Sequence, residues 1–245
     1  RMKDNYILTA ESVTAGHPDK LCDTIADNVL DACLKEDPNA RVACEVLATA
    51  GKILVAGELR TTASPDVEAI VRQTVQNAGY DCNYNVEVRL HTQSPDIAGA
   101  VDGDTLGAGD QGIMYGYACW ETVELLPAPV VLANRITRLL TTCREENLIS
   151  GIGPDGKTQV SVQYAFGVPE RVDTIVISCQ HDSGKNLDEL REELRRLVIA
   201  RACHDVRIDE QTKIFINPSG RFVLGGFEAD TGLTGRKLMV DTYGG

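Results

Sequence analysis

The amino-acid sequence predicts an α+β protein built from repeated strand-strand-helix units. Two passages carry this pattern, and in each of them two strands meet at a glycine-containing turn and a helix follows. The predicted elements are strands at 42–49 and 53–59 with a helix at about 65–77, strands at 159–166 and 171–181 with a helix at about 187–202, and a further helix at about 130–146. Units of this kind are expected to form antiparallel sheets that helices cover on one face.

The first strong helix signal covers residues 17–36. Leu21, Ile25 and Val29 recur at helical spacing, and a proline suits the first turn. Aspartates recur every four residues along the same segment, and for the last three the spacing indicates a solvated face. Asp19 differs from them because it lies in the first turn, at the mouth of the helix.

Composition excludes several classes of partner. The formal net charge of −12 argues against nucleic acid and anionic membranes. A small polyanion remains possible as a ligand, because local basic side chains or a bound Mg²⁺ reverse the field inside a cleft. The eight cysteines contain no CxxC pair, and no run of eighteen apolar residues occurs. These features predict a cytoplasmic protein with reduced thiols and no membrane segment.

Two glycine-rich matches are rejected because their surroundings do not fit. Gly107–Gly112 matches GxGxxG, but no buried strand precedes it, as a dinucleotide site would require. Gly151–Thr158 matches the P-loop pattern GxxxxGK[ST], which needs a strand before it and a helix after it. Here a predicted helix precedes and a predicted strand follows. The glycines are therefore expected to form a turn, and Lys157 is a candidate phosphate ligand at the strand entrance.

Carboxylates and basic side chains in glycine-rich surroundings make up the remaining polar set, and they suit hard cations and phosphate oxygens. Glu45 and Glu58 fall in or at the end of apolar runs, where a carboxylate is costly unless it is paired or binds a cation. A structural salt bridge and a bound ion stay equally open for both. His91, His181 and His204 lack such settings and are expected to be surface or core residues.

A family resemblance emerges from the order of several motifs. Residues 11–20, ESVTAGHPDK, resemble the ESVxxGHPDK signature of the methionine adenosyltransferases, also called S-adenosylmethionine synthetases. Further motifs of that family follow in the family's order: ARVACE at 40–45, GE at 57–58, QSPDI at 93–97, GAGDQGxMxGYA at 107–118, PAP at 127–129, PDGKTQV at 154–160, FINPSGRFVxGG at 215–226 and DTGLTGRK…VDTYGG at 230–245. The resemblance implies a three-unit pseudo-symmetric α+β fold.

The resemblance implies synthesis of S-adenosylmethionine from L-methionine and ATP. The methionine sulfur would attack ribose C5′ and expel tripolyphosphate, which is then hydrolysed to pyrophosphate and phosphate. This displacement needs alignment and stabilisation of the leaving charge, not a nucleophilic side chain. The implied catalytic residues, which would bind the triphosphate, are His17, Lys157, Arg236 and Lys237.

Cations and the other ligands of the site follow from the same resemblance. Asp19 would ligate Mg²⁺, Glu45 would help to hold K⁺, and Phe222 would stack on adenine. The other implied ATP-binding residues are Asp110, Asp155, Gly156, Arg221 and Asp230. The implied methionine-binding residues are Glu58, Gln93 and Asp230.

The resemblance also implies a division into units and an assembly. Residues 1–15 with 121–225 would form a complete first unit, and 16–96 with 226–245 an incomplete second one. Residues 97–120 would be a lid or connector that belongs to a largely absent third unit. A homodimer or dimer of dimers is expected, with the active site between subunits.

The sequence ends at Gly245, before the HGGGAFSGKD segment with which the family continues. We therefore expect little synthesis by the 245-residue chain alone. The alternative function is that of a truncated, non-catalytic ATP-binding fragment or a regulatory subunit of the same family.

Overall fold

The computed structural model describes residues 5–92 and 111–244, and within them one order of elements occurs twice. The order is helix, strand, strand, helix, strand. In the first copy the elements are α1 (Pro18–Glu36), β2 (Arg41–Thr49), β3 (Lys52–Arg60), α2 (Val67–Ala78) and β4 (Asn85–Thr92). In the second they are α4 (Ala128–Glu145), β5 (Ile152–Ala165), β6 (Val168–His181), α5 (Leu187–Leu194), which continues through a π-helical turn at Arg195–Ile199 into α6 (Ala200–Ala202), and β7 (Lys213–Ile216).

Shorter elements complete the chain. They are β1 (Asn5–Val13) at the start and, near the end, η2 (Gly226–Glu228), β8 (Gly232–Leu233) and α7 (Leu238–Asp241). The predicted strand-strand-helix repeat and the predicted α+β class are therefore confirmed, while strands β1, β4, β7 and β8 were not predicted.

The strands form two four-stranded sheets, with orders β1-β5-β6-β7 and β4-β3-β2-β8. The expectation of purely antiparallel sheets is wrong, because β3 pairs with β4 and β6 pairs with β7 in parallel. In each copy a helical segment connects the two parallel strands, α2 between β3 and β4 and α5–α6 between β6 and β7. A helical crossover of this kind returns the chain to the same end of the sheet and therefore produces parallel neighbours. The remaining pairs are antiparallel.

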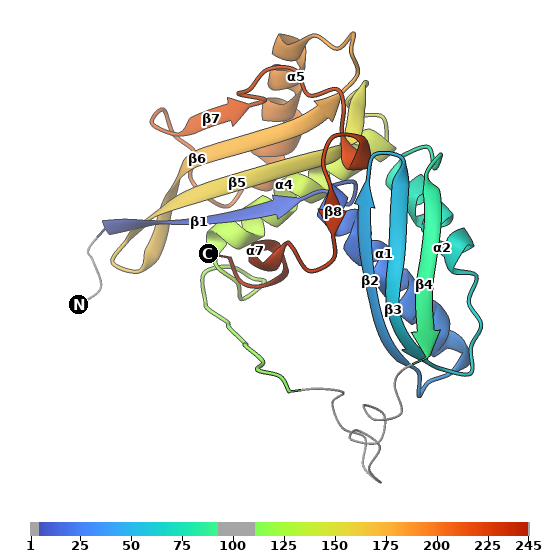
Figure 1. Cartoon of the computed structure of the whole chain (residues 1–245). Coiled ribbons are helices and arrows are strands. Elements are labelled where there is room, and N and C mark those ends of the chain that lie inside the picture. The colour runs from blue at the N-terminus through green and yellow to red at the C-terminus, as the bar shows by residue number, and fades with distance from the viewer. Residues whose placement is uncertain (1–4, 93–110, 245) are drawn as a thin grey trace.

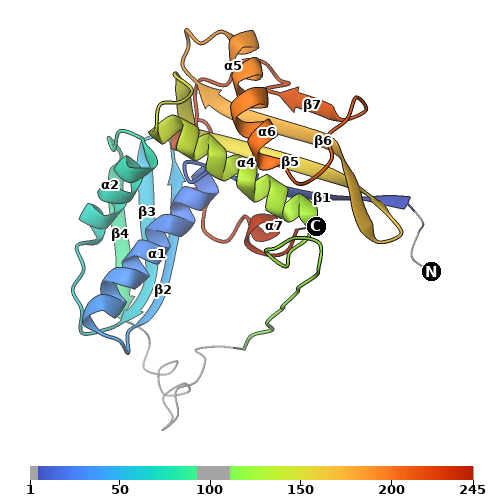
Figure 2. The same cartoon turned by 180° about the vertical axis from the view of Figure 1, so that it is seen from behind.

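One strand of each sheet comes from the opposite end of the chain. β1 comes before the first copy but pairs with β5 of the second. β8 comes after the second copy but pairs with β2 of the first. The chain therefore passes between the sheets after β1, between β4 and β5, and again before β8. The first and the last of these crossings lie side by side in Figures 1 and 2.

Helices cover one face of each sheet and bury two separate apolar cores. Figure 2 shows α1 and α2 in front of one sheet and α4 and α5 in front of the other. In the first copy Leu21, Ile25 and Val29 of α1 are at most 1% exposed, as their spacing predicted. In the second copy the core is formed by residues such as Ile136, Tyr164 and Leu190. The burial of these cores fixes which face of each sheet remains open.

The surroundings of Gly151–Thr158 confirm that this segment is no P-loop. Helix α4 precedes it and strand β5 follows it, in the order that the sequence indicated. One detail differs from the expectation, since β5 already begins at Ile152. Lys157 therefore lies inside the strand, opposite Val13 of β1 and Ser178 of β6, and not at its entrance.

All eight cysteines are free thiols. In the described part of the chain, no helix combines the length and the apolar character needed to cross the lipid bilayer.

Candidate active site

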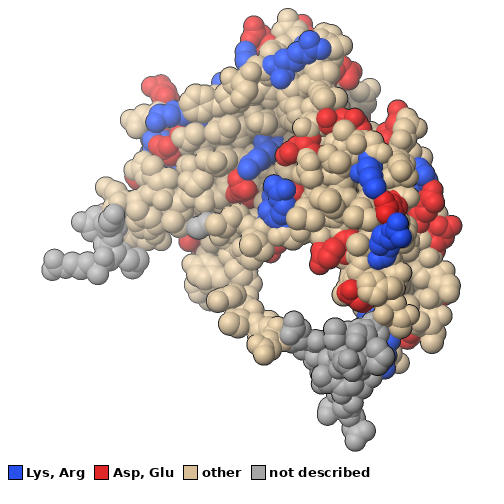
Figure 3. All heavy atoms as spheres, in the orientation of Figure 1, with Lys and Arg blue, Asp and Glu red and all other residues tan. Residues whose placement is uncertain are grey.

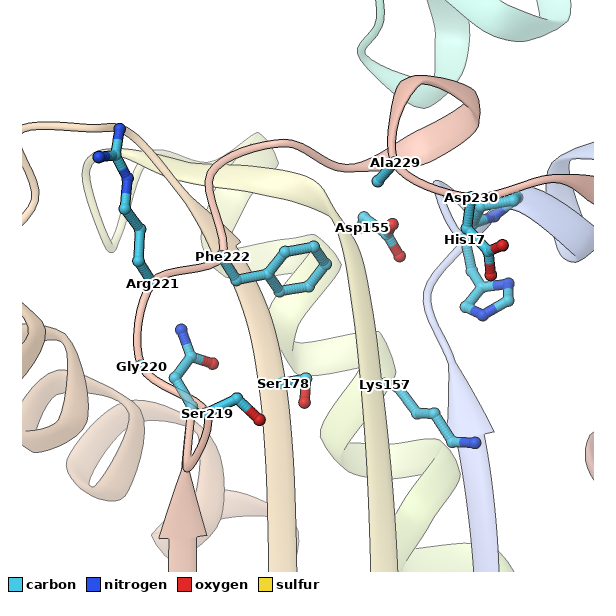
Figure 4. A pocket seen from close by; sticks show the side chains of 12 residues that line it. His17, Asp155, Lys157, Ser178, Ser219, Gly220, Arg221, Phe222, Ala229 and Asp230 are labelled. Carbon is cyan, nitrogen blue, oxygen red and sulfur yellow. The ribbon is translucent and has the colours of Figure 1, made fainter. Parts of the chain in front are cut away.

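A cleft opens at the point where the chain crosses between the two sheets (Figure 4). It is lined by the start of α1, by residues of the inner strands β5 and β6, and by the loop that follows β7. The lining residues are His17, Pro18, Asp155, Lys157, Ser178, Asn217, Ser219, Gly220, Arg221, Phe222, Ala229 and Asp230. Six of the predicted site residues therefore meet in one place, although more than 200 positions separate the first from the last.

The two sides of the cleft differ in chemistry. In Figure 4 the Phe222 ring projects into the middle of the cleft from the loop after β7, and the Lys157 side chain extends from β5 toward β1. His17 and Asp230 lie together at the crossing between the sheets. The Arg221 side chain extends away from the Phe222 ring. An aromatic surface and a cationic side thus face the same space.

His17 caps the N-terminus of α1. Its Nδ1 accepts a hydrogen bond from the Asp19 N–H at 3.2 Å, so this nitrogen carries no proton. Burial, followed by the positive charge of Lys237, lowers the pKa of His17 to about 4. The imidazole is therefore neutral at pH 7, and its other nitrogen is an N–H donor.

Lys157 provides the exposed positive charge of the cleft. Its Nζ lies 2.7 Å from Glu11 Oε2, and the lysine side chain is 44% exposed. A half-exposed ion pair contributes little to stability, so an anionic ligand with several charges can compete for this lysine. The neighbouring Gly156, another predicted ligand, pairs with Cys179 inside the sheet.

Asp155 ties the floor of the cleft to the loop that carries Phe222. Its carboxylate accepts a hydrogen bond from the Gly226 N–H at 2.9 Å, and its own N–H donates to Gln180 Oε1 at 3.0 Å. Gly226 has a φ of +62°, which a residue with a side chain adopts only under strain. Burial raises the pKa of Asp155 to about 6, although hydrogen bonds from the Gly226 and Gly156 N–H groups favour the charged carboxylate.

This raised pKa predicts how Asp155→Asn affects stability. Between the ordinary aspartate pKa of 3.8 and the raised value of about 6, the folded chain binds more protons than the unfolded chain at this site. The contribution of protonated Asp155 to the stability of the folded chain is thus fully present below pH 3.8 and is lost as pH rises through 6. We expect the amide, which still accepts from Gly226, to stabilise the chain by about 2 kcal/mol at pH 8 and not at pH 3.5.

Urea unfolding of the two proteins at both pH values measures this difference. Asp31→Asn, at an exposed position of α1, is the matched control and should change little at either pH. A stabilisation that grows toward acid pH would contradict the assignment.

Asp19 is a buried anion with cationic partners from the far end of the sequence. Its Oδ2 lies 2.5 Å from Lys237 Nζ, and its Oδ1 lies 3.7 Å from Arg236 Nε. Oδ1 also accepts a hydrogen bond from the Leu233 N–H at 2.9 Å. Although burial opposes the charge, the hydrogen bond from Lys237 holds the pKa of Asp19 below its usual range. Arg236 and Lys237, two predicted phosphate ligands, thus lie next to Asp19, the predicted metal ligand.

The donor set around Asp19 fits Mg²⁺ only together with a phosphate ligand. Among the described residues, no group of three or more histidine, cysteine, aspartate or glutamate side chains could hold a metal ion. Mg²⁺ is usually bound through one or two carboxylates plus substrate phosphates, so a single buried carboxylate would suffice if a ligand in the cleft supplied phosphate oxygens. Lys237 would have to leave Asp19 Oδ2 before a metal ion could bind there.

Glu45 and Glu58 do not reach this cleft. Both lie on the face of the second sheet that the helices leave open, Glu45 opposite Ala56 and Glu58 opposite Ala43. The Glu45 side chain is exposed and accepts a hydrogen bond from Thr234, so its apolar surroundings in the sequence do not mean burial. Glu58 Oε1 lies 3.3 Å from His91 Nε2.

The remaining predicted ligands, Gln93 and Asp110, lie outside the described residues, as does most of the predicted lid. Sequence reasoning missed two other groups that hold the cleft, Gln180 and His181. The only signal for them was their place at the end of a predicted strand.

Figure 3 shows acidic and basic side chains interspersed over the face of the molecule seen in Figure 1, with no single large basic patch.

Fold and cleft together define a class of protein: an α+β chain with internal repeats and a cleft that joins an aromatic ring to several cations. A family model described as the N-terminal domain of S-adenosylmethionine synthetase matches residues 5–103, and one described as the central domain matches residues 105–222. The chain belongs to the S-adenosylmethionine synthetase family.

A curated relative supports the same assignment. The chain is 47% identical to an S-adenosylmethionine synthase of Finegoldia magna over an alignment of 261 residues. The alignment covers 98% of this chain and 67% of the relative. The boundary between the two family models does not follow the sheets, because β1 falls in the N-terminal match and pairs with β5 of the central one.

Proposed function

We propose that the chain synthesises S-adenosylmethionine from L-methionine and ATP in the cleft. The observation that carries this proposal is the placement of Phe222 opposite Lys157 and His17. Adenine has a flat π-face that stacks on an aromatic ring, and the triphosphate needs cations and N–H donors at the other end. Both features fit one ATP molecule that lies across the cleft.

The reaction in this proposal is a direct displacement. The sulfur lone pair of methionine forms a bond to ribose C5′, and the C5′–O bond breaks with its electrons moving onto tripolyphosphate. Negative charge therefore accumulates on the leaving oxygen. Lys157, the neutral His17 N–H donor, Arg236 and Lys237 would stabilise this charge, and donors aimed at a developing charge are a main source of rate enhancement. Asp230 would bind the methionine ammonium beside His17.

Two cations belong to the proposal. Asp19 would help to hold Mg²⁺, which would supply positive charge against the charge of the leaving polyphosphate. Lys237 and Arg236, once released from Asp19, would then be free to contact phosphate oxygens. K⁺ would be held with the help of Glu45, whose exposed carboxylate lies on the open sheet face.

Replacement of Glu45 tests the K⁺ assignment. Glu45→Gln removes one negative charge while an amide oxygen can still accept from Thr234. We expect activation of turnover by K⁺ to weaken several-fold and the Mg²⁺ requirement to stay unchanged, because a carboxylate attracts a cation far more strongly than an amide does. Titrations of both cations at constant ionic strength measure this. An unchanged K⁺ response would make Glu45 only the partner of Thr234.

We further propose that the open sheet face completes the site of a second copy in a homodimer. Glu58, a proposed methionine ligand, lies on this face and not in the cleft of its own chain. A site between subunits would bring Glu58 of one chain to the cleft of the other. The proposed assembly is a homodimer or a dimer of dimers.

The direct test of the proposed function combines binding with turnover. Calorimetry should show binding of ATP and of tripolyphosphate to the chain. Product analysis with methionine, Mg²⁺ and K⁺ should show S-adenosylmethionine, at a low rate for the 245-residue chain alone. Binding of both ligands without product would favour the alternative, a non-catalytic ATP-binding role. Binding of neither ligand would reject the cleft as an ATP site.

A further inference from the structure

The geometry points to His181 as a positioning residue that holds Phe222 in place for the nucleotide base. His181 ends strand β6, is 3% exposed and is not among the residues that line the cleft. It acts on the cleft only through the backbone of the loop after β7. The inference rests on the proposed function, since it requires that Phe222 contacts adenine.

One histidine binds both backbone polar groups of Phe222. The Phe222 N–H donates to His181 Nε2 at 3.0 Å, and the His181 N–H donates to the Phe222 carbonyl at 2.9 Å. A buried backbone group without a partner is costly, so the loop at Phe222 is held in this arrangement as long as the histidine is present. The direction of the Phe222 ring into the cleft follows from this backbone position.

The tautomer of the imidazole is fixed by its second nitrogen. His181 Nδ1 lies 2.9 Å from the carbonyl oxygen of Asp182, which can only accept a hydrogen bond. Nδ1 therefore carries the proton, and Nε2 is free to accept from Phe222. A side chain at this position must supply a donor near the main chain and an acceptor farther out.

Neighbouring residues secure the rest of the loop on the same strand end. Gln180 donates to the Val223 carbonyl at 3.1 Å and accepts from the Asp155 N–H at 3.0 Å. The Asn217 side chain accepts from the Cys179 N–H at 2.8 Å and donates to the Cys179 carbonyl at 2.9 Å. Three consecutive residues of β6 thus hold the loop, and His181 is the one that binds at the aromatic residue itself.

Two substitutions separate the two hydrogen bonds of the imidazole. In His181→Asn the amide reaches the position of Nδ1 and can donate to Asp182, but it is too short to accept from Phe222. In His181→Gln the amide oxygen reaches the position of Nε2 and can accept from Phe222. The matched control is His204→Asn, because His204 is exposed and its Nδ1 lies 3.0 Å from the Arg201 carbonyl oxygen, away from the cleft-lining residues.

We expect His181→Asn to weaken ATP binding by about tenfold, which corresponds to the loss of one buried hydrogen bond and of the ring position that it holds. Binding of tripolyphosphate, which has no base, should stay within about twofold of the original value. His181→Gln should restore most of the ATP affinity. Added to Phe222→Ala, His181→Asn should cause little further loss, because both changes act through the same contact.

Calorimetric titration of each variant with ATP and with tripolyphosphate decides the matter. Equal losses for both ligands, no loss of ATP affinity, a His181→Gln variant as weak as His181→Asn, or additive losses with Phe222→Ala would each overturn the role of His181. If the unaltered chain binds neither ligand, the ATP cleft itself fails. Failure of the inference alone would appear as normal binding by the unaltered chain with unchanged affinity in His181→Asn.

Discussion

Replacing Lys157 with alanine is expected to weaken tripolyphosphate binding by roughly 10- to 100-fold and to lower turnover by about a hundredfold or more. Lys157 is the half-exposed cation on the side of the cleft opposite Phe222, and only a half-exposed ion pair with Glu11 holds it. In the proposed reaction, leaving-group charge would develop next to this ammonium, so its loss would cost more in the transition state than in binding.

Calorimetry with tripolyphosphate and steady-state product formation measure the two effects separately. Lys213→Ala removes an exposed lysine from β7 and is the matched control for lysine loss. Gly151→Ala tests the rejected P-loop interpretation, but it adds a side chain at a φ of +72° and its stability must be measured as well. Loss of nucleotide binding by a folded Gly151→Ala variant, equal to that of Lys157→Ala, would restore the P-loop interpretation.

The second large effect concerns Lys237, for which we expect two opposite changes. Lys237→Met removes the ammonium that lies 2.5 Å from Asp19 Oδ2 and leaves the buried carboxylate with the more distant Arg236, whose Nε lies 3.7 Å from Oδ1. Mn²⁺, used as a spectroscopic substitute for Mg²⁺, should then bind about tenfold more tightly in the absence of polyphosphate. Tripolyphosphate should bind about tenfold more weakly, because the same lysine is its proposed ligand.

Electron paramagnetic resonance measures free Mn²⁺ and therefore gives the metal affinity without any turnover. Lys20→Met is the control, since Lys20 belongs to α1, as Asp19 does, but pairs with Asp23 and Asp241. Mn²⁺ binding that does not change in Lys237→Met, or that survives in Asp19→Asn, would remove Asp19 from the metal site. A weakened polyphosphate affinity alone would leave Lys237 as a phosphate ligand that does not compete with the metal.

Much of the local structure was predictable because it depends on neighbours along the chain. The spacing of Leu21, Ile25 and Val29 predicted α1, and these side chains are buried as expected. Strand β4 was missed because its pattern follows a helical crossover and its side chains alternate only weakly between buried and exposed. Its parallel pairing with β3 depends on where α2 returns the chain, which no local pattern records.

For the candidate site, too, the sequence predicted some features and not others. Motif order identified the residues of the cleft, and His17, Lys157 and Phe222 do meet there. Exposure was harder to predict, since Glu45 sits in an apolar run of the sequence yet points to the open face of its sheet. Alternation along a strand does not say which face a neighbouring helix will cover.

The sequence by itself determined the family, the repeated units and the set of polar residues available for chemistry. Only the tertiary structure decided which of these residues hold one another. Asp19 and Lys237 are 218 positions apart, and His181 reaches Phe222 over 41 positions. The first contact exists because β1 and β8 each pair with the sheet of the opposite copy, which brings the two ends of the chain to one cleft. The second exists because β7 pairs in parallel with β6 and leads the following loop past the end of that strand. The physical reason is that hydrogen bonds and ion pairs act over a few ångströms in space, whatever the separation along the chain.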